Sequence, residues 1–250
     1  MSAVRTMPDQ ICGLVPVYNN HLTIEHVTRD LLQQLGQVVV VDDGSDDGTE
    51  TIVDALAAEQ PGRVHIYHLP RNRGKGAAVQ TGLQAIESLG CSHALQVDAD
   101  GQHNLADIPR FLAATKANPH AMIMGAPVFD HSVPAVRKYG RKLTHLMIAL
   151  EAGSTRLPDA MCGFRVYPVA AIRALGRMGS RMCFDPEVMI RAHWAGIPVI
   201  TIPTRVRYLT TEEGGISHFR MVHDNVLHTW THSRLVLQAP MRWLLRWVRQ

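Results

Sequence analysis

Short apolar segments that alternate with helix-length amphipathic segments restrict the fold of this chain more than any other feature. The apolar segments cover residues 11–17, 37–41, 63–69, 94–97 and 121–125, and the helical patterns between them cover residues 21–35, 48–59, 74–89 and 105–116. Short apolar runs bounded by polar turns are typical of strands buried on both faces, and strands that alternate with helices form parallel sheets. We therefore predict an α/β fold with a doubly wound, mostly parallel sheet flanked by helices.

The second half of the chain is less regular. Its periodicity predicts helices at residues 136–150, 186–195 and 220–237, a strand at 198–203 and a loop at 159–165. No internal repeat or linker is evident. We expect one domain over residues 1–219, followed by a helical C-terminal extension over residues 220–250.

Composition excludes several other classes of protein. With 46% hydrophobic residues in 250, the chain is rich enough in apolar side chains to bury a core, and its net charge of +3 is too small to indicate nucleic-acid binding. The four cysteines are widely spaced and are typical of free thiols in a reducing compartment. Because we find neither a signal-peptide pattern nor a long apolar stretch, we expect a cytoplasmic protein.

Polar segments follow three of the predicted strands, at residues 16–20, 42–45 and 98–103. In doubly wound sheets, ligands bind beyond the carboxyl ends of the strands. We therefore expect these three loops to converge on one crevice.

Two carboxylates in the third loop predict a metal site. Asp98 and Asp100 end an apolar strand, and Gln102 follows two positions later. Two carboxylates held close together repel each other unless a cation lies between them, and Mg²⁺ combines one or two carboxylates with phosphate oxygens and water. The alternative is an exposed acidic turn that caps the next helix. The second acidic loop, in the same crevice, favours the metal site.

The acidic pair Asp42 and Asp43 follows a wholly apolar strand. We expect one of these carboxylates to bind a nucleotide base or ribose and the other to stabilise the loop. Residues 71–76 form a basic, glycine-rich turn at the start of a predicted helix. That turn is either an anion cradle or a simple helix start.

Six short motifs follow one another along the chain. They are Pro16-Val17-Tyr18-Asn19, Val41-Asp42-Asp43-Gly44-Ser45, Asn72-Arg73-Gly74-Lys75-Gly76-Ala77, Asp98-Ala99-Asp100-Gly101-Gln102, Cys162-Gly163-Phe164-Arg165 and Phe184-Asp185-Pro186-Glu187. In their order and spacing they resemble the motifs of family 2 glycosyltransferases, and most closely those of the dolichyl- or polyprenyl-phosphate mannosyl- or glucosyltransferase branch. The resemblance covers roughly residues 11–219.

This resemblance implies a GT-A fold, a nucleotide-diphosphate sugar donor and transfer with inversion at the anomeric carbon. The matching positions assign Mg²⁺ or Mn²⁺ to Asp98, Asp100 and Gln102. They assign contacts with the nucleotide sugar to Pro16, Tyr18, Asn20, Val41, Asp43, Lys75, Asp98, Ala99, Arg137, Arg141 and Arg165. At position 20 the family usually has glutamate.

The resemblance leaves the acceptor open between a polyprenyl phosphate and a hydroxyl group of a lipid or glycan. A hydroxyl acceptor requires a general base, whereas a phosphate acceptor does not. Asp185 or Glu187 can supply that base. The predicted catalytic residues are therefore Asp100, Asp185 and Glu187. Two other functions are weighed against glycosyl transfer. One is a nucleotidyltransferase that makes the activated sugar, and the other is a non-catalytic protein that binds sugar nucleotides.

Residues 240–250 read as a short amphipathic helix. Arg242, Arg246 and Arg249 fall on one side of it, and Trp243 and Trp247 fall on the other. Arginine combined with tryptophan is typical of a helix lying at a membrane surface, although a helix docked on its own domain or on a dimer mate has the same pattern. We expect peripheral contact with the inner face of the cell membrane.

Overall fold

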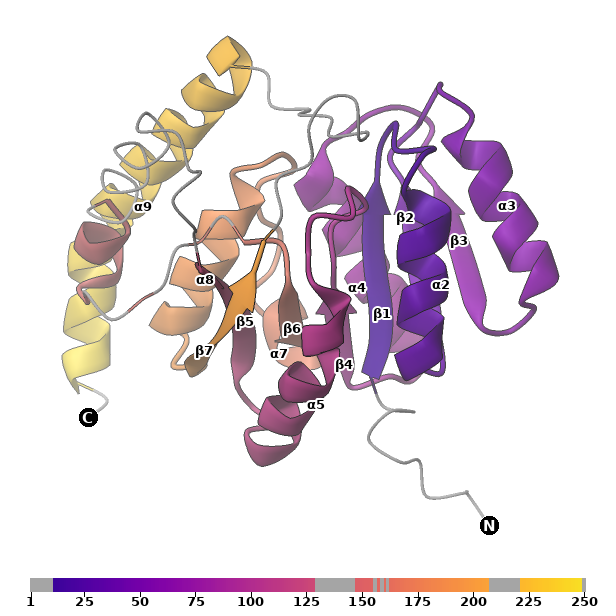
Figure 1. Ribbon diagram of the computed structural model, residues 1–250. Helices are drawn as coiled ribbons and strands as arrows, with labels where there is room; N and C mark the ends of the chain where they lie inside the picture. Colours follow the sequence, from indigo (N-terminus) through magenta and orange to yellow (C-terminus); the bar gives the residue numbers. More distant parts are fainter. Residues whose placement is uncertain are drawn as a thin grey trace.

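The protein is built around one sheet whose seven described strands have the order β3-β2-β1-β4-β6-β5-β7 (Figure 1). The computed structural model describes residues 11–128, 147–154, 157, 160, 162–206 and 221–248. The strands are β1 (Ile11–Val17), β2 (Val38–Asp42), β3 (Val64–His68), β4 (His93–Gln96), β5 (Met122–Val128), β6 (Arg165–Pro168) and β7 (Val199–Arg205).

The pairing of the strands confirms the predicted mostly parallel, doubly wound sheet. Strands β3, β2, β1 and β4 are parallel neighbours, and β5 pairs in parallel with β7. Strand β6 lies antiparallel between β4 and β5. It begins at Arg165, within the segment predicted as a loop, so that prediction was wrong at its last residue. A four-residue strand that starts with a buried arginine lacks the apolar pattern by which strands are recognised.

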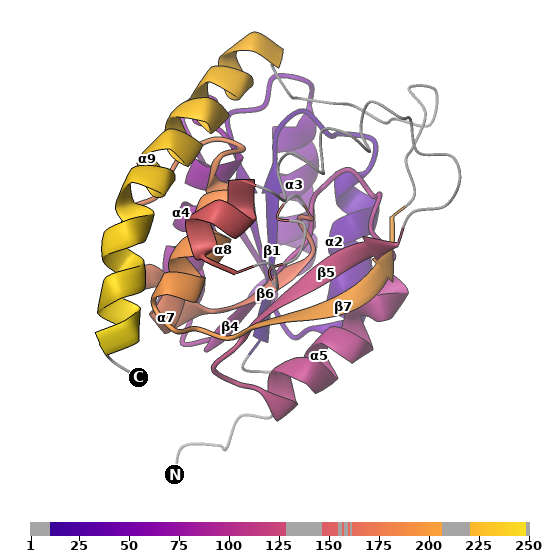
Figure 2. The same cartoon turned by 90° about the vertical axis from the view of Figure 1, so that its left-hand side faces the viewer.

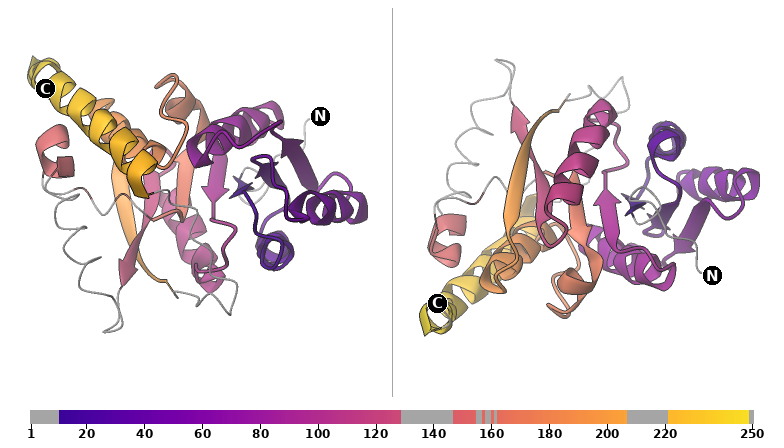
Figure 3. Two further views of the ribbon diagram at one scale, coloured as in Figure 1. Left: turned by 90° about the horizontal axis from the view of Figure 1, so that it is seen from above. Right: turned by 90° about the horizontal axis from the view of Figure 1, so that it is seen from below.

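Helices cover both faces of the sheet, as the views from above and below show (Figure 3). One hydrophobic cluster joins the sheet to α4, α7, α8 and α9, and the other joins it to α2, α3 and α5. The helices are α2 (Ile24–Gln34), α3 (Thr49–Glu59), α4 (Lys75–Ser88), the 3-10 turn η1 (Leu105–Asp107), α5 (Ile108–Ala117), α7 (Val169–Arg173), α8 (Phe184–Trp194) and α9 (Met221–Val248).

The central strands are buried on both faces, which explains their apolar sequences. All four valines of β2 have no exposed surface, and the strand ends at Asp42, where the chain turns into a polar loop. Because alternate residues point to opposite faces, a strand covered by helices on both sides must be apolar along its length. The first carboxylate therefore appears where this strand leaves the core.

The C-terminal extension is one long helix, α9, which lies against the helical layer on one side of the molecule (Figure 2). The predicted break between residues 237 and 240 is absent, because the helix continues through Pro240. On this helix, Nδ1 of His232 lies 2.6 Å from a carboxylate oxygen of the buried Glu151. In the described part of the chain, no helix combines the length and apolarity needed to cross a bilayer. Most of the helix predicted at residues 136–150 lies outside the described residues.

Candidate active site

The three polar loops leave the sheet at the same edge. Strands β2, β1 and β4 are parallel neighbours, with Val17 opposite Asp42 and the N–H of Val97 donating to the carbonyl of Leu14. Adjacent strands lie about 4.8 Å apart, so the ends of β2 and β4 are separated by roughly 10 Å across β1. The acidic loops after β2 and β4 therefore flank the loop after β1.

Asp43 organises the basic turn that precedes α4. Its carboxylate accepts hydrogen bonds from the backbone N–H groups of Arg73 (2.7 Å) and Gly74 (2.6 Å), and the residue is only 2% exposed. Burial raises the pKa of Asp43, while these two bonds and the charge of Arg181 oppose the rise. Gly74 has φ of +96°, a conformation that favours glycine. Asp43 therefore holds the turn in the position from which α4 begins.

Lys75, the first residue of α4, joins this turn to the third loop. Its Nζ lies 2.8 Å from Oδ1 of Asp98 and 3.1 Å from Oδ2 of Asp185. Burial alone would lower the pKa of Lys75, but the two carboxylates outweigh it and raise the pKa above its usual value. The ammonium group thus stays charged and balances the negative charge of one carboxylate from the loop after β4 and of one from α8.

A buried arginine on β6 is the last member of this charge network. Arg165 on β6 has no exposed surface, and its Nη1 lies 3.3 Å from Oδ1 of Asp185. The guanidinium also donates to the carbonyl of Cys162 (2.7 Å), to that of Asp185 (3.1 Å) and to that of Ala160. Because each of its three nitrogens donates to a backbone carbonyl, Arg165 fixes the loop before β6 and the start of α8.

Asp98 occupies a space that only a glycine neighbour leaves open. A Cβ atom on Gly163 would overlap the Asp98 carboxylate. On its other side, Nε2 of His103 lies 3.8 Å from Oδ2 of Asp98, and the His103 ring packs against Phe164 with centroids 5.6 Å apart. Burial acts to raise the pKa of Asp98, but Lys75 and His103 outweigh it and hold the pKa well below its usual range.

Asp100 and Gln102 provide oxygen donors beside Asp98. Oδ1 of Asp100 accepts a hydrogen bond from the backbone N–H of Gln102 (3.0 Å), and both side chains are half-buried. Burial and the negative charge of Asp98 raise the pKa of Asp100. Unlike Asp98, Asp100 forms no ion pair with a lysine or arginine within the described residues. Partly exposed carboxylate and amide oxygens are the ligands that hard divalent cations take, so these residues fit Mg²⁺ or Mn²⁺.

Three of the predicted site residues are engaged within the protein. The Val41 side chain is fully buried in the core, and Arg165 is fully buried with its donors engaged. Glu187 is also fully buried, and it accepts hydrogen bonds from the N–H of Gly179 (2.9 Å), from Arg191 (3.1 Å) and from Arg234 (2.6 Å). These contacts hold neighbouring segments together, and the ligand contacts predicted for these three residues stay predictions.

The other predicted nucleotide-sugar residues differ in exposure. Tyr18 is half-buried, whereas Pro16, Asn20 and Ala99 are buried. The amide of Asn20 donates to the carbonyl of Tyr18 (2.8 Å), which shapes the loop after β1. Arg137 and Arg141 lie outside the described residues.

Sequence reasoning missed two residues beside the crevice, His103 and Arg181. His103 directly follows the acidic motif, so its position next to Gln102 was an available signal. Arg181 comes from the loop before α8, more than 100 residues after the turn that it faces, and no spacing pattern connects the two.

A second group of possible metal ligands lies on the surface, at Glu50, Asp54 and His68. His68 is placed by two carboxylates, with Nδ1 3.0 Å from Asp42 and Nε2 3.0 Å from Asp54. These contacts explain the arrangement without an ion.

Comparison with known proteins places these features in a family. The model of the family described as glycosyl transferase family 2 matches residues 13–176. A dolichyl-phosphate beta-glucosyltransferase of Trichomonas vaginalis is 31% identical over 217 residues, which are 76% of this chain and 61% of that protein. A polyprenol monophosphomannose synthase of Mycolicibacterium smegmatis is 30% identical over 214 residues, which are 82% of this chain and 78% of the relative. The chain thus spans about three fifths of the length of the first relative.

Solved structures share the fold at low sequence identity. Glucosyl-3-phosphoglycerate synthase from Mycobacterium tuberculosis in complex with UDP superposes with a TM-score of 0.65 at 15% identity, over 91% of this chain and 80% of that one. The same enzyme in complex with Mn²⁺, UDP-glucose and phosphoglyceric acid gives a TM-score of 0.61 at 16% identity, over 82% of this chain and 74% of that one. The architecture is therefore the one seen in GT-A glycosyltransferases.

Proposed function

We propose that this chain, which belongs to glycosyl transferase family 2, transfers a sugar from a nucleotide-diphosphate donor to a lipid-linked acceptor with inversion at the anomeric carbon. The observation that carries the proposal is the connection of the two acidic loops. Asp43 holds the turn before α4, and Lys75 in that turn reaches Asp98. One rigid unit therefore supports a nucleoside at β1 and β2 and a diphosphate beside β4.

In this arrangement the nucleoside lies over the loop after β1, beside Tyr18 and Asp43. The diphosphate lies towards β4, where Asp98, Asp100 and Gln102 hold Mg²⁺ or Mn²⁺. The named complexes of the structural relative contain Mn²⁺ together with UDP-glucose, which supports a divalent ion and a nucleotide sugar. A divalent ion there neutralises the negative charge that the departing nucleotide carries.

The contacts of Asp185 favour an acceptor that needs no general base. Its carboxylate is 1% exposed and forms ion pairs with both Lys75 and Arg165. A general base must lie within hydrogen-bond reach of the hydroxyl group from which it takes a proton, and a carboxylate buried in this way has almost no surface to offer one. A phosphate monoester is already ionised and can attack without losing a proton. Together with relatives named for dolichyl phosphate and polyprenol, this supports a lipid phosphate over a hydroxyl acceptor.

We propose that the membrane contact expected for residues 240–250 includes the rest of α9. Four apolar side chains with more than half of their surface exposed lie on this helix, at Val226, Trp230, Leu237 and Met241. At 100° per residue they fall within about 60° of one another, so they form a stripe, which we name the α9 stripe. An exposed apolar stripe on an amphipathic helix suits a lipid surface. We therefore propose residues 1–219 as the catalytic domain and α9 as its membrane contact.

The proposal is tested by replacing the carboxylate assigned to the metal. Purified protein is given a panel of nucleotide sugars with Mn²⁺ or Mg²⁺ and membrane extract, and release of nucleotide and lipid-extractable label are measured. Asp100→Ala should lower turnover at least about a hundredfold, because the leaving-group charge is no longer neutralised.

Asp107→Ala provides the matched control, because this carboxylate belongs to η1 and bonds Thr204 (2.8 Å), away from the acidic pair. Transfer that proceeds at a near-normal rate in Asp100→Ala, or at an equal rate with a chelator present, would refute the metal assignment. Nucleotide release without labelled lipid would instead refute the lipid acceptor.

A further inference from the structure

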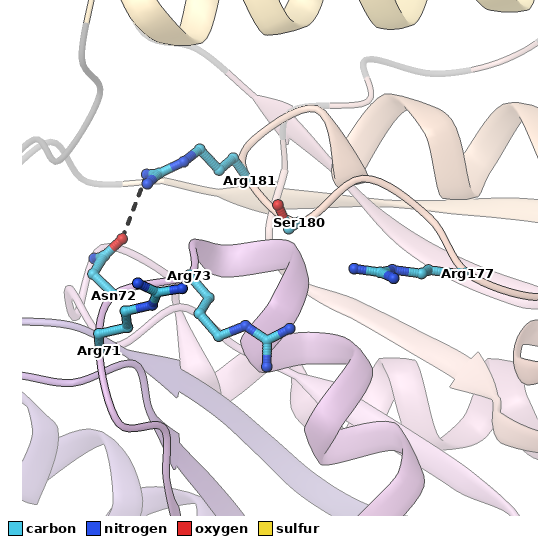
Figure 4. A pocket seen from close by; sticks show the side chains of 6 residues that line it. All are labelled: Arg71, Asn72, Arg73, Arg177, Ser180 and Arg181. Atoms are coloured by element: carbon cyan, nitrogen blue, oxygen red, sulfur yellow. Dashed lines mark hydrogen bonds between the residues drawn. The ribbon is translucent and has the colours of Figure 1, made fainter.

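Four arginines line one pocket beside the crevice, and within the described residues none of them forms an ion pair with a carboxylate. The pocket has a volume of about 460 Å³ and is lined by Arg71, Asn72, Arg73, Arg177, Ser180 and Arg181 (Figure 4). We call it the arginine pocket. Its residues come from two segments, the turn before α4 and the loop before α8, which face each other across the opening.

The missing counter-charge distinguishes these arginines from others in the protein. Arg29, Arg110, Arg173 and Arg191 each form an ion pair with a carboxylate. Within the described residues, by contrast, no carboxylate lies within ion-pair distance of any arginine of the pocket; Arg181 donates to the neutral amide of Asn72 (3.4 Å). Four positive charges gathered in one place repel each other unless an anion joins them.

Direct hydrogen bonds hold the two walls of the pocket together, so the site is preformed. The N–H of Ala77 donates to the carbonyl of Ser180 (2.8 Å), and the side chain of Gln80 accepts from the N–H of Met178 (3.0 Å). A Cβ atom on Gly74 would overlap the backbone of Arg181, so the walls approach as closely as glycine permits. A site whose walls are fixed loses little conformational freedom when a ligand binds.

The side chains of the pocket are separate from the proposed metal site, and the pocket meets the donor site only at Asp43, which accepts a hydrogen bond from the backbone N–H of Arg73. Lys75 follows Arg73 by two positions, but its Nζ is committed to Asp98 and Asp185 in the crevice. None of the six lining residues contacts Asp98 or Asp100 by a hydrogen bond or ion pair in the described part of the chain.

We propose that the arginine pocket binds a phosphate-bearing ligand outside the donor site. Guanidinium groups bind phosphate oxygens through paired hydrogen bonds, and a phosphate or diphosphate carries more negative charge than a single carboxylate. The same chemistry is offered by a phospholipid headgroup and by a soluble phosphate compound. The pocket is open and its arginines are mostly exposed, so it accepts either source.

The test removes one arginine from each wall. Binding of inorganic pyrophosphate is measured by calorimetry with a chelator present, so that no metal assists binding at Asp98 and Asp100. The double variant Arg71→Gln and Arg177→Gln should weaken this binding about tenfold or more, because each lost guanidinium removes charge-assisted hydrogen bonds. Arg173→Gln is the matched control, since it removes a nearby exposed arginine that is already paired with Glu87.

Vesicles distinguish the two sources of phosphate. Sedimentation with phosphatidylglycerol vesicles is measured against sedimentation with phosphatidylcholine vesicles. If the ligand is a headgroup, sedimentation with phosphatidylglycerol should fall in the double variant, and pyrophosphate should compete with it in the wild type. If the ligand is soluble, the double variant loses pyrophosphate binding but sediments like the wild type. The proposal is overturned if the double variant and Arg173→Gln bind pyrophosphate equally well.

The proposal for the arginine pocket and the proposed donor chemistry can be refuted independently of each other. The double variant should release nucleotide from UDP-glucose and Mn²⁺ at a rate within about twofold of the wild type, whereas Asp100→Ala should not. A parallel loss of donor turnover and pyrophosphate binding in the double variant would show that the pocket is part of the donor site and would overturn its separate role.

Discussion

Lys75 controls the charge balance of the crevice. It is the cation shared by Asp98 and Asp185, and its side chain is only 13% exposed. Without it, the ion-pair contact left to Asp98 within the described residues is the longer one to His103, at 3.8 Å. A buried charge that loses its partner costs far more than an exposed one, because water cannot replace the missing interaction.

Lys75→Met should therefore lower the free energy of unfolding by about 2–4 kcal/mol in urea denaturation. Adding Asp98→Asn should restore part of the loss, because the unpaired negative charge is then removed. Lys116→Met, at the exposed end of α5, is the control for loss of a lysine. Equal stability of the Lys75 and Lys116 variants would contradict this account.

His68 makes stability depend on pH. Burial lowers its pKa, but the hydrogen bonds to Asp42 and Asp54 outweigh burial and raise the pKa above its usual value. The stabilisation by protonated His68 is therefore fully present below the pKa of the unfolded chain, about 6.5, and is lost as the pH rises through the higher pKa of the folded state.

His68→Gln should consequently destabilise the protein more at pH 5.5 than at pH 9. The difference should be below about 1 kcal/mol, because the side chain is one-third exposed and water screens the ion pairs. Urea unfolding of both proteins at the two pH values measures it. A difference that is constant with pH, or larger at pH 9, would rule out the protonated imidazole as the source.

At the scale of elements, Glu187 connects three parts of the chain. It lies on α8, accepts from Gly179 in the preceding loop and bonds Arg234 on α9. The same loop carries three residues of the arginine pocket, and the start of α8 carries Asp185. The position of α8 thus determines the geometry of both sites.

Glu187→Gln tests whether this residue acts through structure alone. The neutral amide keeps the shape but loses the charge, so stability should fall by about 1–3 kcal/mol. Donor turnover per folded molecule should stay within about twofold of the wild type, since the side chain does not reach the crevice. Thermal unfolding and nucleotide release on the same preparation give both values. A selective loss of turnover in a fully folded variant would return Glu187 to the catalytic set.

At the scale of the whole molecule, the protein presents an exposed apolar surface on α9. The α9 stripe runs along the helix that covers one side of the molecule (Figure 2). α9 itself is fixed to the domain by the contacts of Arg234 with Glu187 and of His232 with Glu151. A rigid helix with one face anchored and the other apolar can hold the domain at a lipid surface.

Replacing Trp230 and Leu237 by glutamine should lower sedimentation with phosphatidylglycerol vesicles about tenfold or more, because two exposed apolar side chains no longer enter the lipid. Ser233→Gln, on the same exposed face, adds a glutamine without removing apolar surface and should sediment like the wild type. Unchanged sedimentation of the double variant would show that the stripe does not contact lipid.

The sequence alone was sufficient to predict the parallel strands in the first half of the chain and the loops that carry the acidic residues. Strands buried on both faces need continuous apolar runs, as in β2, so a carboxylate such as Asp43 occurs only after the strand has ended. These are local constraints, so local pattern reveals them. The predicted boundaries of β1 and β2 accordingly agree with the structure within a residue.

Only the tertiary structure decided which charged side chains face the crevice and which hold the core together. Arg165 and Glu187 belong to motifs that resemble catalytic ones, yet packing buries both and pairs them within the protein. The antiparallel β6 and the arginine pocket likewise depend on segments about 70 and 100 residues apart in the chain. Burial and pairing at such separations depend on how the helices and strands pack, and no pattern within one segment records that packing.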